Sequence, residues 1–120
     1  MSYDYSLFKA PGPGPMESWP AAEPEPLGTI DDLKRRLAGM FPDIQWEHEL
    51  GSWFGRWEKR DRYAEFQVAP ESDGQIRFLT IRRAERREVE TLSRHLGVVA
   101  VDPQRMELYS GLTAEWTAAR

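Results

Sequence analysis

The chain contains no cysteine, and this absence removes several kinds of chemistry at once. Disulfide bonds, zinc–thiolate sites and thiol nucleophiles all require cysteine. No apolar run approaches the roughly 18 residues that a membrane-spanning helix needs. The first residues also lack the basic and apolar regions of a secretory signal. We therefore expect a soluble, cytoplasmic protein with no cofactor, no metal site and no membrane attachment.

The length and charge of the chain narrow the choice further. A chain of 120 residues fits one domain, which we predict to span residues 1–120. Five Trp, five Phe and four Tyr can build a small core, because each buried aromatic ring removes a large area from water. The formal net charge is −4, and residues 1–50 are the acidic part of the chain, with nine acids against four bases. Since nucleic-acid binders normally present a basic stripe, this charge argues against a nucleic-acid partner.

Alternating apolar and polar residues predict a four-stranded antiparallel meander between Ile44 and Arg82. Its strands are expected at residues 44–50, 53–58, 64–68 and 76–82. The last strand has apolar residues on both faces, so we expect it to be central in the sheet. Gly74 can take the positive φ that a turn before this strand needs. Short links between consecutive strands favour the meander arrangement.

Two helices and further strands near both ends complete a predicted α+β fold, mainly an antiparallel sheet with two helices packed on it. Thr29 can cap a helix that runs to Gly39, where a left-handed residue would end it. A second helix is expected from Glu85 to Leu96. Additional strands are expected at residues 3–7, 98–101 and 106–109, the last of these at an edge. We predict a tail or a helical turn held by Trp116 over residues 112–120.

Residues 11–27 are rich in proline and glutamate. Proline cannot donate the amide hydrogen bond that a strand needs, so this segment is predicted to be a loop. Trp19 is its only large apolar residue. Because loops of this length are unusual inside compact domains, we predict loose order here rather than a functional lid.

The main candidate site is a row of acids on the first two meander strands. Glu47 and Glu49 share one face of their strand, and Glu58 of the next strand extends the row. Such a row could dock onto a basic cleft of another protein, because complementary potentials speed association. Tryptophan is common at binding hot spots. The candidate partner-binding residues are Glu47, Glu49, Trp53, Glu58, Glu23 and Glu25.

Other interpretations of the same residues remain open. The acids could simply form a solvated strand face whose charge discourages edge pairing. A small enzyme or ligand-binding domain, with a pocket between sheet and helices, would use Glu47, His48 or Tyr63. A structural subunit of a larger assembly would expose an apolar patch around Trp53. We assign no catalytic residue, because neither His48 nor His95 has an identifiable partner, and neighbours along a strand point to opposite faces.

The basic run at residues 82–87 resembles a nucleic-acid site only in its charge. It holds four arginines, but it lacks interleaved aromatic residues and glutamates dilute it. We expect these arginines to pair with acids elsewhere on the fold.

Both ends of the chain resemble those of small, uncharacterised bacterial proteins. Residues 1–8 carry a Ser-Tyr-Asp motif in an expected strand, and residues 96–104 end in an Asp102-Pro103-Gln104 turn. Proteins of this size and build are similar to the immunity proteins that accompany bacterial toxins. The resemblance implies a non-enzymatic protein, monomeric or weakly dimeric, that neutralises a cognate toxin or effector domain by direct contact. The turn itself is expected to be structural, because Asp102 can cap local amides.

Overall fold

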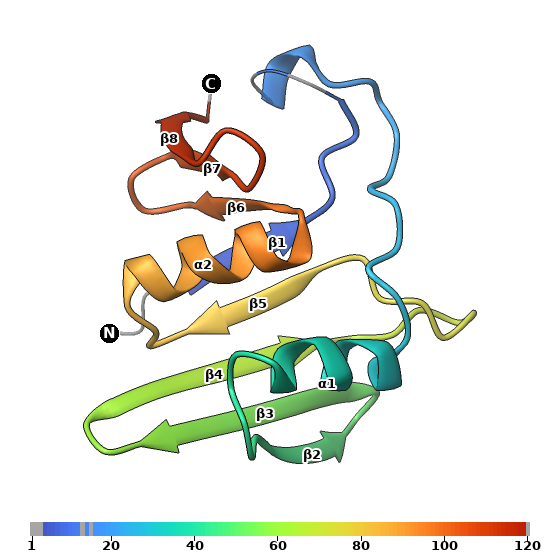
Figure 1. The fold of residues 1–120 in the computed structure, drawn as a ribbon. Coiled ribbons are helices and arrows are strands. Elements are labelled where there is room, and N and C mark those ends of the chain that lie inside the picture. Colours follow the sequence, from blue (N-terminus) through green and yellow to red (C-terminus); the bar gives the residue numbers. More distant parts are fainter. Residues whose placement is uncertain (1–3, 13, 15, 120) are drawn as a thin grey trace.

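The computed structural model describes residues 4–12, 14 and 16–119. In this part of the chain, eight strands form one antiparallel sheet in the order β2-β3-β4-β5-β1-β6-β7-β8 (Figure 1). The strands are β1 (Asp4–Phe8), β2 (Gln45–Glu49), β3 (Ser52–Lys59), β4 (Arg62–Val68), β5 (Leu79–Arg82), β6 (Val99–Asp102), β7 (Glu107–Ser110) and β8 (Glu115–Ala118). The helices are α1 (Ile30–Ala38), α2 (Arg86–Leu96) and a short 3-10 helix, η1 (Met16–Ser18).

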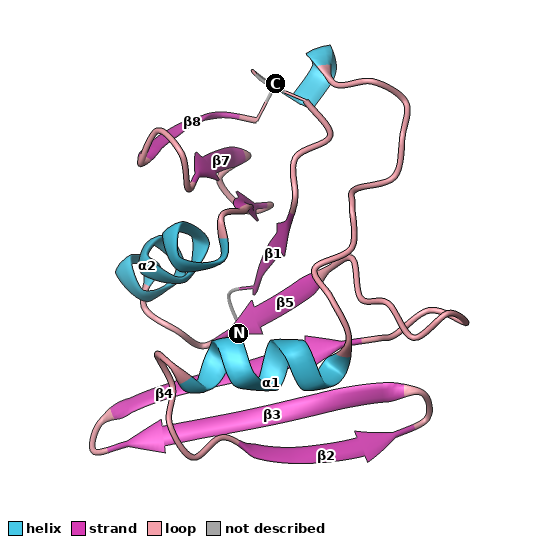
Figure 2. Cartoon of the chain, turned by 45° about the vertical axis from the view of Figure 1, so that its right-hand side comes forward, coloured by secondary structure: helices cyan, strands magenta, loops and turns pink. Residues whose placement is uncertain are grey.

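Both long helices pack on the same face of the sheet, which we call the helix face. Leu37 of α1 and Leu92 of α2 belong to one buried cluster with residues of the central strands, including Ile81 of β5. The opposite side of the sheet is the outer face. In Figure 2, α2 and residues 9–27 lie on opposite sides of β1. The two helices therefore cover one face, and the long loop crosses the other.

The predicted meander is confirmed as four consecutive strands, β2 to β5. β5 lies between β4 and β1, so the prediction of a central strand is also confirmed. This strand begins at Leu79 rather than at Ile76. Ile76 instead bridges to Gly28, exchanging backbone hydrogen bonds with the end of the long loop. The turn before it contains Gly74 at a φ of 80°, as predicted.

The helix ends follow local capping chemistry. Thr29 caps α1, and Asp32 completes a capping box by accepting from the Thr29 backbone amide. Gly97 ends α2 in the left-handed conformation at a φ of 68°, as predicted. The prediction of a left-handed residue at Gly39 is wrong, because Gly39 stays helical at a φ of −65°. The chain turns left-handed later, at Asp43.

The prediction of a helical turn after Leu112 is also wrong, because the C-terminal residues add β8 to the sheet. Trp116 lies opposite Tyr109 of β7, with ring centroids 5.2 Å apart. The guanidinium carbon of Arg86 lies 3.8 Å from the centroid of the Trp116 ring. Trp116 is half-buried by these contacts, and the other residues of β8 are exposed. β7 is therefore an inner strand and β8 is the edge.

An aromatic cluster forms the core beneath α1. Phe41 contacts Trp57 and Phe66, with ring centroids 5.0 and 5.1 Å away respectively. Trp57 is 3% exposed and belongs to this core. Tyr5 and Leu7 of β1 are buried on the same face, whereas Tyr3 lies outside the described residues.

A smaller apolar cluster lies on the outer face of the other half of the sheet. It contains Phe8, Val99 and Leu108, and Trp19 of the long loop packs against it. The Phe8 and Trp19 rings meet edge to face, with centroids 5.8 Å apart. The loop thus has an apolar anchor at the tryptophan that the sequence singled out. Among the described residues, no helix is long and apolar enough to cross a membrane.

Candidate functional site

The pairing of β2 with β3 decides which side chains share a surface. Glu47 lies opposite Phe54, and Glu49 lies opposite Ser52. Because side chains alternate along a strand, these residues and Glu58 all point to the outer face. We call this surface of β2 and β3 the hairpin face. The structure thus places the three acids on one face, with Glu47 and Glu49 adjacent on β2 and Glu58 separated from them by Arg56, roughly 20 Å along β3 from the position opposite Glu49.

The hairpin face is acidic but not uniformly so. Arg56 lies among the acids, and its guanidinium is 3.9 Å from a carboxylate oxygen of Glu47, with both side chains exposed. A shallow hollow of about 380 Å³ lies beside Arg56, Glu58 and Tyr63. Phe54 is 37% exposed in the middle of this surface. The face therefore combines three carboxylates, one guanidinium and an accessible aromatic ring.

Leu50 forms the tip of the same hairpin. Its side chain is 98% exposed, and its backbone takes a φ of 52°. Left-handed backbone costs a non-glycine residue about 1 kcal/mol. The turn is formed by Leu50 and Gly51. An apolar side chain in water and a strained backbone thus coincide at the tip.

Trp53 lies on the helix face and does not join the acids. Its ring stacks on His48 with centroids 4.4 Å apart and planes within 1°. The ammonium of Lys34 on α1 lies 4.0 Å from the Trp53 ring centroid. His48 is therefore oriented by Trp53, and the neighbouring carboxylates point the other way, as expected.

Gly55 explains how this side of the hairpin is packed. A Cβ atom at this position would come within 2.9 Å of ring atoms of Trp46 and of the side chain of Ile44. The absence of a side chain lets Trp46 lie across β3. The glycine between the two tryptophans of β3 is therefore a packing requirement.

The two loop acids lie in separate places. Glu23 is 3.6 Å from Arg77, whose pKa is raised above its ordinary value chiefly by a hydrogen bond to Glu71. Glu25 lines a pocket on the outer face of the other half of the sheet. The six predicted contact residues thus divide between the hairpin face, the helix face and the loop.

The residues of the enzyme alternative do not converge on one site. Glu47 and His48 point to opposite faces of β2, and Tyr63 lies beneath the guanidinium of Arg83. The other histidine, His95, lies with its Nε2 3.2 Å from the backbone oxygen of Arg36. Within the described residues, no group of three or more His, Asp or Glu side chains could hold a metal ion.

The arginines of residues 82–87 pair with acids, as predicted. Arg82 lies 3.1 Å from Asp4, and Arg83 lies 3.2 Å from Glu65. Arg87 pairs with Glu85 on the exposed surface. These arginines are therefore neutralised within the fold.

Arg86 forms the most buried of these pairs. It contacts Asp102 at 2.9 Å and Glu107 at 2.7 Å. Burial lowers the pKa of Arg86, but the hydrogen bond and charge of Glu107 outweigh it, and the pKa is raised overall. Asp102 also accepts hydrogen bonds from the backbone amides of Gln104 and Arg105. The Asp-Pro-Gln turn is thus structural, as expected.

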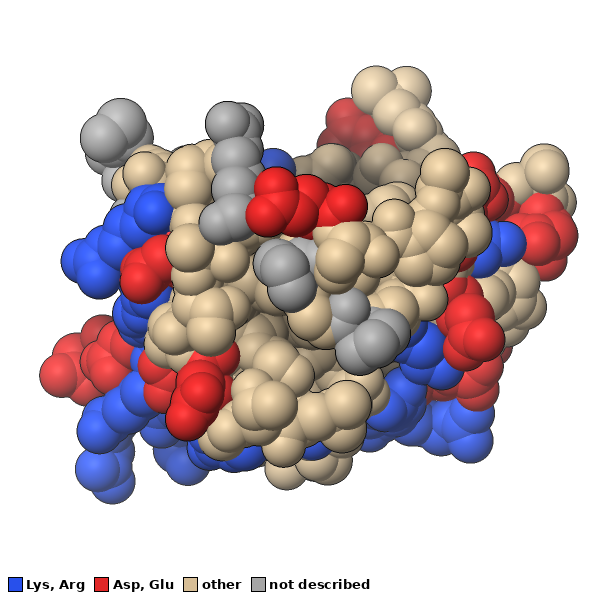
Figure 3. All heavy atoms as spheres, turned by 90° about the horizontal axis from the view of Figure 1, so that it is seen from above, with Lys and Arg blue, Asp and Glu red and all other residues tan. Residues whose placement is uncertain are grey.

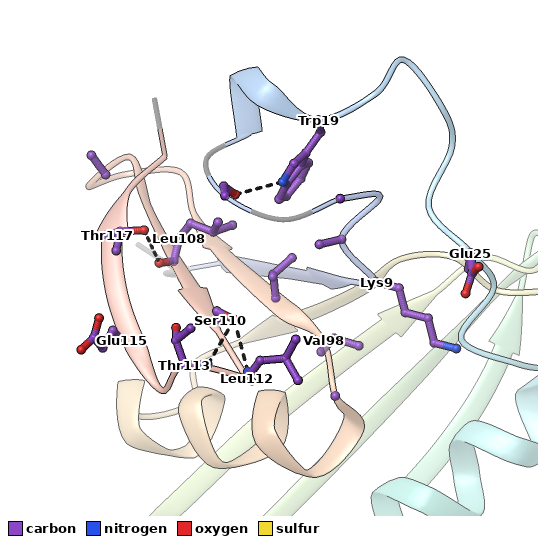
Figure 4. Close-up of a pocket in the computed structure, with 16 residues that line it drawn as sticks. Lys9, Trp19, Glu25, Val98, Leu108, Ser110, Leu112, Thr113, Glu115 and Thr117 are labelled. Carbon is purple, nitrogen blue, oxygen red and sulfur yellow. Dashed lines mark hydrogen bonds between the residues drawn. The ribbon is translucent and has the colours of Figure 1, made fainter.

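Sequence reasoning missed a pocket between the long loop and the C-terminal strands (Figure 4). Its volume is about 830 Å³, and it lies next to the outer-face cluster of Val99 and Leu108. Seen from the side of β8 and η1, charged residues lie mostly around the margins and uncharged surface fills much of the middle (Figure 3). The one sequence signal was Trp19, a lone aromatic residue in a proline-rich loop. The residues of the C-terminal strands that line the pocket show no local sequence pattern that would indicate it.

Comparison of the chain with protein-family models, curated proteins and solved structures found no match. The two outer-face surfaces, the hairpin face and the pocket, are the candidate functional sites of the described residues.

Proposed function

We propose that this protein is a non-enzymatic binding protein of the immunity type, acting in the cytoplasm as a monomer or weak homodimer. It neutralises a cognate bacterial toxin or effector domain by direct contact. The observation that carries the proposal is the hairpin face, where Glu47 lies opposite an exposed Phe54, with Glu49 further along β2 and Glu58 at the far end of β3, on the side of the sheet away from α1 and α2.

The tip of the hairpin supports this proposal. Leu50 contributes almost no buried apolar area to the fold, because 98% of its side chain is exposed. Strained backbone positions that persist in a fold are found often at functional sites. A partner that covers Leu50 and Phe54 would bury both apolar side chains and would account for their placement.

The charge of the hairpin face indicates the chemistry of the partner. Three carboxylates against one guanidinium favour a cleft rimmed by lysine or arginine. Complementary charges of this kind mainly raise the association rate, and salt screens them over about 8 Å at physiological ionic strength. An enzyme that acts on a polyanion such as nucleic acid would offer a cleft of this sign.

The proposal is tested by capturing the partner through the hairpin face. A photo-reactive phenylalanine analogue at position 54 would crosslink the partner in the source cells, and mass spectrometry would identify it. The purified partner would then be assayed for its own activity with and without this protein. We expect binding and inhibition to occur together.

The binding surface is tested with two double variants that change the net charge equally. Glu47→Lys/Glu49→Lys alters the hairpin face, and Glu17→Lys/Glu115→Lys alters exposed acids elsewhere. We expect the first to weaken affinity at least tenfold and to abolish inhibition, and the second to keep both. Equal affinities of the two variants would sink the proposed surface.

A further inference from the structure

The outer-face pocket has the size and lining of a small-molecule site. Its volume of about 830 Å³ falls in the range of roughly 300–1,000 Å³ that is typical of ligand pockets. Val99 and Leu108 give the pocket apolar lining. Trp19 of the loop lies across the pocket from Leu108 (Figure 4). Leu112, in the turn between β7 and β8, completes the apolar lining. Such apolar lining with a few polar groups is usual for these sites.

Leu112 shows that the apolar lining is incompletely covered. Its side chain is 90% exposed although it lines the same pocket as Val99 and Leu108. Trp19 is also only half-buried, despite its contact with Phe8. A ligand seated between them would remove both surfaces from water, which is favourable by roughly 25 cal/mol per Å².

Two hydroxyl groups of the pocket lining form hydrogen bonds within the fold. Ser110 Oγ accepts from the backbone amides of Leu112 and Thr113, at 3.2 and 3.4 Å. Thr117 Oγ1 donates to the backbone oxygen of Leu108 at 3.5 Å. Ser110 Oγ only accepts in these bonds, so its O–H can still donate to a ligand, and the charged residues of the lining add to the polarity of the site.

Lys9 is the one basic residue among those that line the pocket. It is half-buried, and it forms no ion pair with any described residue. The acids of the lining, Glu25 and Glu115, are exposed. Charges interact more strongly where water is partly excluded, so the ammonium of Lys9 would attract an anion more than the exposed carboxylates would attract a cation. Lys9 lies on the same side of the pocket as Glu25, opposite strands β7 and β8 (Figure 4).

We propose that this pocket binds an amphipathic carboxylate. The apolar part of the ligand lies on Val99, Leu108 and Leu112 beside Trp19, and its carboxylate pairs with the ammonium of Lys9. The site lies in the half of the sheet away from the hairpin face, so the inference is independent of the proposed toxin partner.

Three ligands with the same ten-carbon chain test the polarity of the site. Decanoate, decanol and decylamine would be titrated into the full chain by calorimetry, below their micelle concentrations. We expect decanoate to bind most tightly. Lys9→Gln should weaken decanoate at least fivefold and leave decanol unchanged. Glu25→Gln should strengthen decanoate, because it removes a neighbouring negative charge. Lys59→Gln, on β3, is the matched control and should change nothing.

Two exposed leucines test the location of the site. Leu112→Ser should weaken all three ligands severalfold, whereas Leu50→Ser, at the distant hairpin tip, should leave them unchanged. Both side chains are almost fully exposed, so neither substitution should affect folding, and thermal unfolding curves would verify this. The inference is overturned if decanoate fails to bind, if decylamine binds more tightly than decanoate, or if the two leucine variants behave alike.

Discussion

The two halves of the sheet are alike on the helix face and different on the outer face. In the half formed by β2 to β5, α1 covers one side and the hairpin face is open and charged. In the half formed by β1 and β6 to β8, α2 covers one side, and the outer side is apolar and partly covered by the long loop. The first half thus offers a surface for a macromolecule, and the second offers a pocket for a small one.

The halves also differ in what holds each helix to the sheet. Beneath α1 the contacts are aromatic, between Phe41, Trp57 and Phe66. Beneath α2 they are polar as well: Arg94 donates to the hydroxyl of Tyr109 at 2.6 Å, and Trp116 donates to Glu90 at 2.7 Å. Apolar burial therefore stabilises both helices on the sheet, and part-buried polar pairs add to it beneath α2.

The largest expected effect on stability tests the aromatic contacts beneath α1. Phe66→Ala should destabilise the protein by about 3–5 kcal/mol, because it leaves a cavity beneath α1. Phe54→Ala, on the other face of the same two strands, should change the free energy of unfolding by less than about 0.5 kcal/mol. Urea unfolding measures both. Similar losses at the two positions would contradict the assignment of the faces.

The polar contacts beneath α2 are tested at Asp102. Asp102→Ala leaves the partly buried Arg86 with one acidic partner fewer, and it removes the acceptor of the turn amides. We therefore expect the free energy of unfolding to fall by about 3 kcal/mol. Glu47→Ala breaks only an exposed contact with Arg56 and should cost well under about 1 kcal/mol. A small effect at Asp102, measured by chemical unfolding, would show that ion pairing does not hold α2.

A smaller effect is expected at Gly55. Gly55→Ala pushes Trp46 and Ile44 away from β3 and should cost about 1–3 kcal/mol, as overpacking usually does. Gly51 is not a useful control, because its φ of 80° adds backbone strain. Ser52→Ala, in the same strand, should change stability little. If Gly55→Ala has no effect on the thermal midpoint, the packing of the hairpin against α1 is wrong.

The smallest effect concerns the start of α1. Thr29→Ala removes the helix cap and should cost about 1 kcal/mol. The pKa of Asp32 is lowered by hydrogen bonds from the backbone and side chain of Thr29, and further by Arg35. A lowered folded-state pKa means that the stabilisation is complete above the ordinary Asp value of about 3.9 and is lost as pH falls through the folded value.

Asp32→Asn should therefore destabilise the protein near pH 7, and the difference from the unsubstituted chain should shrink as the pH falls below about 4. Unfolding curves at pH 7 and pH 3 measure this. Thr113→Ala, in an exposed turn, is the control for Thr29→Ala. A difference that grows in acid would contradict the capping role of Asp32.

Local patterns were enough to predict most of the elements. The meander follows from period-2 alternation, and the helix ends follow from Thr29 and Gly97, whose effects act within a few residues. β8 could not be predicted, because Trp116 among alanines and threonines shows no alternation. That strand exists through pairing with β7 and through the contact of Arg86 with the Trp116 ring.

The sites were harder to predict because they depend on contacts between distant residues. Trp53 and Phe54 are both apolar, and only the pairing of β3 with β2 and β4 shows that Trp53 faces α1. The pocket joins residues 9–25 to residues 97–118, and no local pattern encodes that meeting. The acidic row was predictable since all three acids lie on two adjacent strands.

Amide hydrogen exchange of the chain, alone and with its captured partner, tests the division of roles between the halves most directly. We predict that the partner protects residues 45–58 and leaves residues 98–118 unchanged. Protection confined to residues 98–118, with exchange in β2 and β3 unaltered, would contradict the claim that the hairpin face binds the partner.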